Sequence, residues 1–248
     1  MRKILRVGGA DRVEFLQGLV TNDVTRAPVW AAMLTPQGKY LADFLIVPDE
    51  EALLIDVDAR LADDLMRRLS MYRLRAAVEI AETDLGVRRG TGTPPPAAIP
   101  DPRHPALGWR LYGPAEGDDG TDWDAIRVAH VIPETLIELI PNETFILEAG
   151  FERLHGIDFR KGCYVGQEVT ARMKHKAELR KGLAAVSIDG AAPVGTPIVM
   201  ADGREAGTLF TQSGGRAIAH LRFDRMDGPL TAGGARVSAT DERAQAAP

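Results

Sequence analysis

Cysteine is nearly absent from this sequence, because Cys163 is the single one among 248 residues. One thiol excludes a disulfide within the chain and is typical of a reducing compartment. It also excludes a metal or iron–sulfur site built only from cysteines of one chain, since such sites usually take four protein ligands. The histidines show no metal-site spacing either, so we predict no metal site.

Long apolar runs are absent too. No stretch approaches the roughly 20 residues of a membrane-spanning helix. The N-terminus is basic but has no apolar core of a signal peptide. Aromatic residues make up only 6% of the chain, yet the hydrophobic total of 45% is enough for a sizeable core in one or two domains. We therefore predict a protein without membrane contact, placed in a bacterial-type cytoplasm or an equivalent matrix.

Charge is unevenly distributed along the chain. The formal net charge is −5, but residues 152–181 hold eight Lys or Arg against four Asp or Glu, which leaves this segment at +4. A basic segment on an acidic protein indicates an anionic ligand such as a polyglutamate tail, a phosphate or RNA. A solvated helix face explains the same pattern equally well. We expect no direct DNA binding.

The first 90 residues mix strands and helices. Asp11, with Glu14 three residues later, resembles a capping box that starts a helix. Residues 36–39 read as a hairpin turn, and Asp58 is suited to cap a second helix. No regular β-α-β-α rhythm appears, so we predict an α+β fold. The strands are predicted at 31–35, 40–47, 52–57 and 77–81.

The rest of the chain changes character twice. Residues 90–122 are rich in Pro, Gly and acids and are predicted as long loops around one strand at 107–112. Residues 124–155 return to helical patterning. From residue 183 onward, short alternating segments lie between Gly-containing turns, which is typical of a small antiparallel barrel or sandwich. These last strands are predicted at 183–188, 197–200, 206–212, 217–221 and 235–240.

The most informative stretch is residues 161–168, which read K-G-C-Y-V-G-Q-E. Its two glycines allow a positive φ or the close approach of a ligand. Lys161 would lower the pKa of the Cys163 thiol, because a nearby positive charge favours the thiolate. A buried cysteine that fills a core gap is the alternative. Since Gly, Lys, Gln and Glu neighbours describe a loop, and function concentrates in loops, we favour a functional thiol.

This motif, with V-T-A-R-M after it, resembles the signature of the YgfZ-type folate-binding proteins, relatives of the aminomethyltransferase (T-protein) of the glycine cleavage system. Residues 15–24 are similar to the opening helix and loop of T-proteins, and residues 34–39 resemble the family's hairpin turn. The resemblance covers about residues 5–225. It implies a T-protein-like folate-binding α+β domain followed by a small antiparallel β-barrel, which we place at residues 1–178 and 179–242.

The resemblance also implies a ligand, tetrahydrofolate or another reduced folate. The pterin of a folate needs polar contacts, and its glutamate tail needs cations. Cys163 would be the functional thiol, with Lys161 beside it. The residues that the resemblance assigns to folate binding are Asn22, Asp43, Arg127, Gln167, Glu168 and Arg172.

Two departures from T-proteins bear on catalysis. T-proteins often carry two adjacent acids on the strand after the hairpin, whereas this chain has Ala42 before Asp43. T-proteins also carry an R-x-E-A-G pattern, in which Ala129 replaces the acid that follows Arg127. Loss of an acid–base group typically costs ~10²–10⁴-fold in rate. We therefore expect a folate-binding accessory factor and not a catalytic aminomethyltransferase.

The resemblance implies a folate-dependent role in iron–sulfur cluster assembly or repair that affects tRNA-modifying iron–sulfur enzymes. The expected partners are iron–sulfur proteins, their assembly machinery and tRNA-modifying enzymes. Two alternatives stay open. Asp43 is compatible with a tetrahydrofolate-dependent aminomethyltransferase-like enzyme, and the basic segment is compatible with an RNA-binding tRNA-modification factor.

Overall fold

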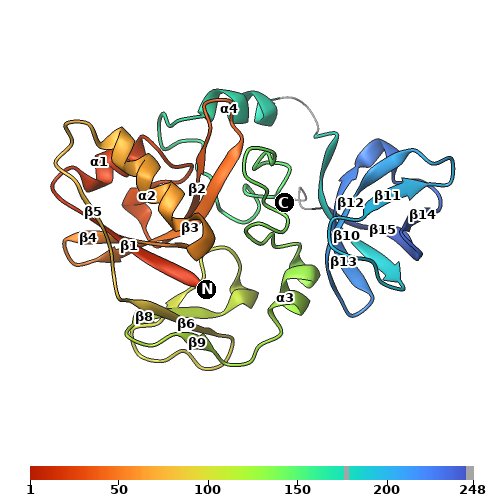
Figure 1. Ribbon diagram of the computed structural model, residues 1–248, viewed down its shortest axis with the longest axis horizontal. Helices are drawn as coiled ribbons and strands as arrows, with labels where there is room; N and C mark the ends of the chain where they lie inside the picture. Colours follow the sequence, from red (N-terminus) through yellow and green to blue (C-terminus); the bar gives the residue numbers. More distant parts are fainter. Residues whose placement is uncertain (176–178, 244–248) are drawn as a thin grey trace. The chain divides into compact units, whose positions relative to one another are not determined.

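The computed structural model describes residues 1–175 and 179–243, and the chain forms two compact units. Unit 1 comprises Met1–Thr121 and Leu154–Val169, and unit 2 comprises Asp122–Arg153 and the chain from Thr170 onward. The chain therefore leaves unit 1, returns to it once and leaves it again (Figure 1). The predicted domain boundary after residue 178 lies outside the described residues and stays a prediction.

A five-stranded antiparallel sheet forms the centre of unit 1, with strand order β2-β3-β4-β1-β5. The predicted hairpin between β2 and β3 is confirmed: in its turn, the amide of Gly38 donates to the carbonyl of Thr35 (2.8 Å). The strands are β1 (Arg2–Gly8), β2 (Val29–Leu34), β3 (Tyr40–Asp49), β4 (Ala52–Asp58) and β5 (Glu79–Glu82).

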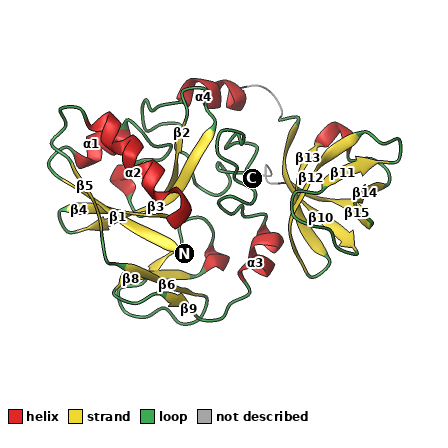
Figure 2. Ribbon diagram, viewed as in Figure 1, coloured by secondary structure: helices red, strands yellow, loops and turns green. Residues whose placement is uncertain are grey.

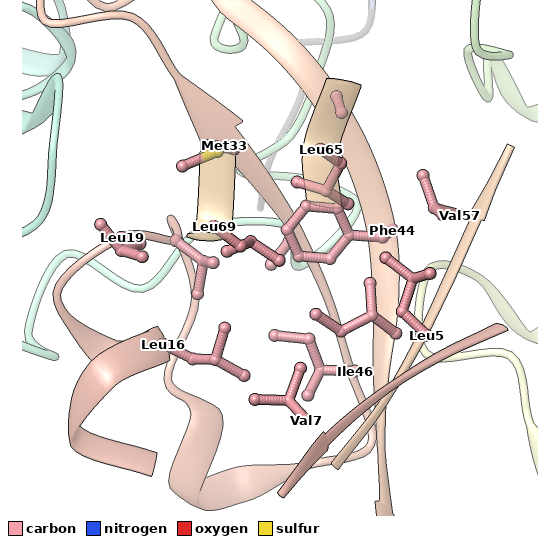
Figure 3. Packing of buried hydrophobic residues seen from close by; sticks show 14 of the residues in the cluster. Leu5, Val7, Leu16, Leu19, Met33, Phe44, Ile46, Val57, Leu65 and Leu69 are labelled. Carbon is pink, nitrogen blue, oxygen red and sulfur yellow. The ribbon is translucent and has the colours of Figure 1, made fainter. Parts of the chain in front are cut away.

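One face of this sheet is apolar and packs against helices α1 (Arg12–Gln17) and α2 (Ala59–Arg73) (Figure 2). Side chains alternate between the two faces of a strand, so Phe44 and Ile46 of β3 point to the same side. Figure 3 shows them beside Leu65 and Leu69 of α2. These residues are at most 1% exposed and form the core of unit 1.

The two helix starts behave differently. Asp58 caps α2 as predicted, because its Oδ1 accepts a hydrogen bond from the amide of Arg60 (2.9 Å). Asp11 precedes α1, but its carboxylate makes no cap and instead accepts from the amide of Ala77 (2.7 Å). The predicted capping box is therefore wrong, since a long-range backbone donor takes the carboxylate.

Residues 86–118 form a second small sheet, where the sequence predicted loops around one strand. Its order is β7-β8-β6-β9. Strands of two residues carry no alternation of apolar and polar positions, so the sequence pattern could not reveal them. The strands are β6 (Gly86–Gly90), β7 (Ile99–Pro100), β8 (Trp109–Gly113) and β9 (Gly117–Asp118).

A set of charged side chains joins the two sheets of unit 1. Asp56 is fully buried and accepts hydrogen bonds from Arg2 Nε (2.6 Å), Arg110 Nη1 (2.8 Å) and the Tyr112 hydroxyl (2.9 Å). Burial alone would raise the pKa of Asp56, but the charges of Arg2 and Arg110 outweigh burial and hold that pKa below its ordinary value. The members of this buried ion cluster are Arg2, Asp56, Asp101, Arg103, Arg110 and Tyr112.

Unit 2 opens with helix α3 (Trp123–His130). The helical pattern predicted for residues 124–155 is wrong beyond His130. Val131 takes a left-handed conformation (φ 49°) that ends the helix, and Pro133 follows, which cannot continue one. Turns then lead to helix α4 (Gln167–His175).

Six strands of unit 2 form a closed barrel in the order β10-β13-β12-β11-β14-β15. Its interior holds Val186, Ile198, Leu209 and Val237, each at most 2% exposed. The predicted barrel is confirmed, and the sequence missed only β14, a strand too short to show a pattern. The strands are β10 (Lys181–Asp189), β11 (Pro197–Met200), β12 (Glu205–Ser213), β13 (Arg216–Arg222), β14 (Leu230–Ala232) and β15 (Ala235–Arg243).

Candidate functional site

Cys163 is exposed on the loop of residues 161–166, within the segment that returns to unit 1. Gly162 (φ 104°) and Gly166 (φ 85°) both adopt positive φ values, which only glycine takes without strain. The structure thus confirms the loop that the motif predicted and excludes a core cysteine. Its thiol is presented to solvent between two backbone turns.

Lys161 anchors this loop to the end of helix α1. Its ammonium donates to the carbonyls of Gln17 (2.5 Å) and Val20 (2.7 Å) and lies 5.1 Å from the centroid of the Tyr164 ring. The last carbonyls of a helix carry partial negative charge, so a cation is favoured there. Burial lowers the pKa of Lys161 to about 8, against the opposing charges of nearby carboxylates. Lys161 therefore positions the loop, and its effect on the thiol stays a prediction.

The second glycine of the motif lets the loop touch the β2–β3 hairpin. A Cβ on Gly166 would lie 2.6 Å from the carbonyl oxygen of Thr35, closer than any real contact allows. A Cβ on Gly38, in the hairpin turn, would lie 2.9 Å from Cβ of Val169. A Cβ on Gly162 would meet nothing within 4 Å. Close packing therefore requires glycine at positions 38 and 166, whereas position 162 requires it for conformation alone.

Asn22 and its neighbour Thr21 tie the returning segment to the first sheet. The Thr21 hydroxyl donates to the carbonyl of Gly156 (2.7 Å). The side-chain amide of Asn22 donates to the carbonyls of Trp30 (2.7 Å) and His155 (2.6 Å), and the residue is 8% exposed. Both amide hydrogens of Asn22 are thus used within unit 1. Its predicted contact with a folate stays a prediction.

Asp43 lies on β3 and is 4% exposed. Its neighbours along the strand belong to the helix-covered core, so its carboxylate points to the opposite face of the sheet. It accepts hydrogen bonds from Trp30 Nε1 (2.9 Å) and the Tyr40 hydroxyl (2.8 Å). The guanidinium of Arg103, from the buried ion cluster, lies 5.9 Å from the Trp30 ring centroid. Asp43 is therefore an interior carboxylate held in place by two donors.

Arg127, the third residue carried over from T-proteins, lies in unit 2 and is 4% exposed. Its Nη2 donates to Glu138 Oε2 (2.6 Å) and to the Thr211 hydroxyl (2.8 Å), and its Nη1 donates to Asp124 (2.8 Å). These bonds fasten α3 to strand β12 of the barrel. The guanidinium thus has a structural task, and its predicted contact with folate stays a prediction.

The three remaining candidates lie on α4, directly after the Cys163 loop. The amide of Gln167 donates to the carbonyl of Tyr164 (3.2 Å), which begins the helix, and its side chain is half-buried. Glu168 and Arg172 are exposed and four residues apart, so they share one face of the helix. This places Gln167 and Glu168 in unit 1 with Cys163, and Arg172 in unit 2.

The basic segment is partly neutralised in the structure. Lys174 forms an ion pair with Glu152, and Lys181 lies 3.5 Å from Glu148. Lys176 lies outside the described residues. These pairs favour a solvated, ion-paired surface over an RNA-binding face.

Sequence reasoning missed several residues that shape the site. Trp30 and Tyr40 hold Asp43, and Tyr164 lies under the Lys161 ammonium. Tyr164 does lie within the motif of residues 161–168, and Tyr40 precedes Asp43 by three residues at the start of the same predicted strand; Trp30 carried no signal.

No group of three or more His, Cys, Asp and Glu side chains within residues 1–175 and 179–243 is placed to hold a metal ion. In the same described ranges, no helix combines the length and hydropathy that crossing a membrane demands.

Comparison with known proteins gives one matching family model and one structural likeness. Residues 180–244 match the family model of the CAF17 C-terminal beta-barrel domain. The crystal structure of the glycine cleavage system aminomethyltransferase T from Bartonella henselae superposes with a TM-score of 0.72 at 12% sequence identity, covering 98% of this chain and 85% of that chain. This likeness shows that the fold is that of T-proteins, as predicted.

Curated relatives share the name iron–sulfur cluster assembly factor IBA57, mitochondrial. The protein of Mus musculus is 30% identical over 92% of this chain and 78% of its own length. The homologue of Mycosarcoma maydis is 32% identical over 75% of this chain and 55% of its own length, so the chain spans about half of that fungal relative.

These relatives contradict one sequence prediction and confirm another in part. The predicted cytoplasmic placement is wrong, because the relatives from mouse, human and fungi are mitochondrial by name. The resemblance to YgfZ-type proteins identified the T-protein-like fold correctly, but these relatives bear the name IBA57. With 30% identity to the mouse protein across 78% of its length, the chain belongs to the IBA57 family of iron–sulfur cluster assembly factors.

Proposed function

We propose that this protein is an accessory factor of iron–sulfur cluster assembly that acts through the thiol of Cys163. The observation that carries the proposal is an exposed, solitary cysteine on a loop fixed at Lys161 and Gly166, in a chain of this family. A thiol whose backbone is held in place is suited to meet a partner protein in one orientation.

One cysteine sets a limit on what this chain does by itself. Iron–sulfur clusters are usually held by four protein ligands, and the chain has a single thiol. A cluster that reached Cys163 would need its other ligands from a second protein. The proposed partners are therefore iron–sulfur proteins and their assembly machinery, with tRNA-modifying iron–sulfur enzymes among the final recipients.

We also propose that unit 1 binds tetrahydrofolate or another reduced folate near Asp43. The T-protein fold and the interior carboxylate held by Trp30 and Tyr40 support this proposal. Ala42 and Ala129 stand where T-proteins carry acids, so binding without aminomethyl transfer is expected. The candidate contacts for the ligand in unit 1 are Asn22, Asp43, Gln167 and Glu168. The contacts predicted at Arg127 and Arg172, which belong to unit 2, stay predictions.

The role of the thiol is tested in cells that lack the endogenous protein. We expect Cys163→Ser and Cys163→Ala proteins to accumulate at normal levels but to leave iron–sulfur enzymes inactive, because serine keeps the shape and loses the thiolate. Asp64→Asn, an exposed ion-pair change on α2, is the control and should restore enzyme activity fully. Full rescue by the serine variant would overturn the proposal.

The folate proposal has its own experiment. Tetrahydrofolate is titrated into the purified protein, and an aminomethyl-transfer assay follows on the same sample. Asp43→Ala should weaken binding while the circular dichroism spectrum and melting temperature show that the protein still folds. Unchanged affinity in that variant would remove Asp43 from the site, and robust turnover by the unmodified protein would favour a transferase.

A further inference from the structure

Exposed apolar residues gather at the C-terminal end of α2, among residues that the proposed function does not use. Met71 is 70% exposed, Tyr72 is 43% exposed and Leu74 is 88% exposed. Single exposed apolar residues are common on protein surfaces, but three within four residues are not scattered. We call residues 71–75 the α2-end patch.

The backbone of this patch is strained at its most exposed residue. Leu74 has φ 44° and ψ −103°, and the amide of Ala76 donates to the carbonyl of Arg73 (2.8 Å). This is the geometry of a type II′ turn with Leu74 at the first central position, where glycine is strongly preferred. Leucine at this position costs free energy twice, because its backbone adopts a conformation that suits glycine and its apolar side chain is exposed to water. Neither cost is compensated by packing within unit 1, so an interaction with another molecule is the expected source of compensation.

Charge indicates what kind of surface would complement the patch. Arg73 and Arg75 flank Leu74 and are exposed, and neither forms an ion pair with any residue in the described part of the chain. By contrast, Arg67 and Arg68 one turn earlier both pair with Asp64. The patch therefore combines an apolar centre with two uncompensated cations, on a chain whose net charge is −5. Its complement is an apolar pocket bordered by carboxylates.

We propose that the α2-end patch docks a partner protein of the iron–sulfur assembly machinery through such an acidic-rimmed apolar pocket. The class of partner rests on the proposed function, whereas the chemistry of the pocket rests on the patch alone. A nucleic acid fits less well, because Tyr72 is the one aromatic side chain of the patch that can stack on a base and only two cations are uncompensated. An anionic membrane fits less well for the same shortage of cations.

The experiment measures binding of the full-length protein to purified iron–sulfur scaffold and carrier proteins of the same organism, one at a time, by calorimetry. Leu74→Gly removes the apolar side chain and relaxes the turn. We expect it to weaken binding about tenfold or more and to raise the melting temperature at the same time. Arg73→Ala with Arg75→Ala should slow association and reduce its salt dependence. Val194→Ala is the matched control, since it truncates an apolar residue in unit 2 that is 55% exposed. It should change neither the affinity for the partner nor the melting temperature.

The outcomes separate this proposal from the proposed function. Loss of affinity in Leu74→Gly with normal affinity in Cys163→Ala supports docking at the patch. Equal affinity of Leu74→Gly and the unmodified protein overturns it, as does a fall in melting temperature, which would give Leu74 a packing role. Binding only to phosphatidylglycerol vesicles or to a single-stranded RNA probe, or no binding to any assembly protein, also overturns it. Full cellular rescue by Cys163→Ser would instead count against the proposed function and leave the docking result standing.

Discussion

At the scale of single residues, Lys161 differs from what its neighbourhood in the sequence predicted. Two residues from Cys163, it was expected to act on the thiol, yet its ammonium bonds to the carbonyls of Gln17 and Val20. Adjacent positions in a loop can point in different directions, and a sequence cannot say which acceptor a long side chain reaches. Exposure of Cys163, in contrast, was predictable, because its polar and glycine neighbours describe a surface loop.

The lowered pKa of Lys161 predicts a pH dependence of stability. The folded protein releases this proton near pH 8, whereas the unfolded chain holds it to about pH 10.4. The unfolded state therefore binds more protons in this window, so the free energy of unfolding contributed by Lys161 rises as pH increases from about 8 to about 10. Urea unfolding of the unmodified protein and of Lys161→Met at pH 7.5 and pH 9.5 measures the difference.

The comparison isolates one group, because other lysines and tyrosines titrate equally in both proteins. The increase in the free energy of unfolding from pH 7.5 to pH 9.5 should be smaller in Lys161→Met than in the unmodified protein. An identical gain in both proteins would show that the ammonium keeps its ordinary pKa in the folded state.

Asp56 carries a second prediction at the residue scale. Replacing it with Asn leaves the guanidinium groups of Arg2 and Arg110 buried without their shared carboxylate, and breaking a buried pair of this kind costs about 3–5 kcal/mol. Asp64→Asn, which removes an exposed pair on α2, should cost less than about 1 kcal/mol. Equilibrium urea unfolding at pH 7 compares the two. A similar loss of unfolding free energy in both variants would mean that the buried ion cluster contributes no more to stability than an exposed ion pair.

At the scale of elements, the contact between the Cys163 loop and the hairpin predicts unequal effects of two glycine substitutions. Gly162→Ala introduces only backbone strain, on the order of 1–3 kcal/mol. Gly166→Ala adds a Cβ 2.6 Å from the carbonyl of Thr35 and should destabilise the protein further, moving the loop. Thermal unfolding and the rate of Cys163 labelling report both effects. If Gly166→Ala matches Gly162→Ala in both measurements, the loop does not rest on the hairpin.

Elements with clear periodicity were predicted well, and those without it were not. The hairpin and five of the barrel strands follow from alternation and turn residues, and Asp58 was correctly read as a cap. In the second sheet, β8 overlaps the strand predicted at 107–112, whereas β7 and β9 are two residues long and β6 contains a single large apolar residue, Val87. The helix predicted through residue 155 ended at His130, because a single left-handed residue, Val131, overrides apolar spacing. Short-range patterns do not encode such long-range or single-residue events.

At the scale of the whole molecule, the candidate residues are divided between two units of the chain, which no motif could show. Asn22, Asp43 and Cys163 belong to unit 1 and Arg127 to unit 2. The sequence identified candidate residues but not the groups that they contact. Arg127, for example, donates hydrogen bonds to Glu138 and to Thr211, which lies 84 residues later in the chain. The T-protein-like fold was predictable because an eight-residue motif is specific.

The discontinuity of unit 1 leads to a truncation prediction. A chain ending at residue 169 contains the segment Leu154–Val169, whereas a chain ending at residue 153 lacks it, and both contain the same residues of unit 2 up to that point. We expect the longer chain to show a cooperative melt of unit 1, detected by the fluorescence of buried Trp30, and the shorter one to melt at lower temperature or not cooperatively. Identical melts would show that unit 1 is complete without the returning segment.

Because unit 1 is discontinuous, its two segments emerge from the ribosome at different times. Synthesis adds about 5–20 residues per second, so roughly 2–10 s separate the emergence of residue 121 from that of residue 169. During that interval residues 17–22 lack the hydrogen bonds that they later form with the returning segment. These involve the carbonyls of Gln17 and Val20 and the side chains of Thr21 and Asn22. The N-terminal sheet is therefore synthesised before the segment that completes its hydrogen bonds, and unit 1 can reach its full set of contacts only after the cysteine loop has been made.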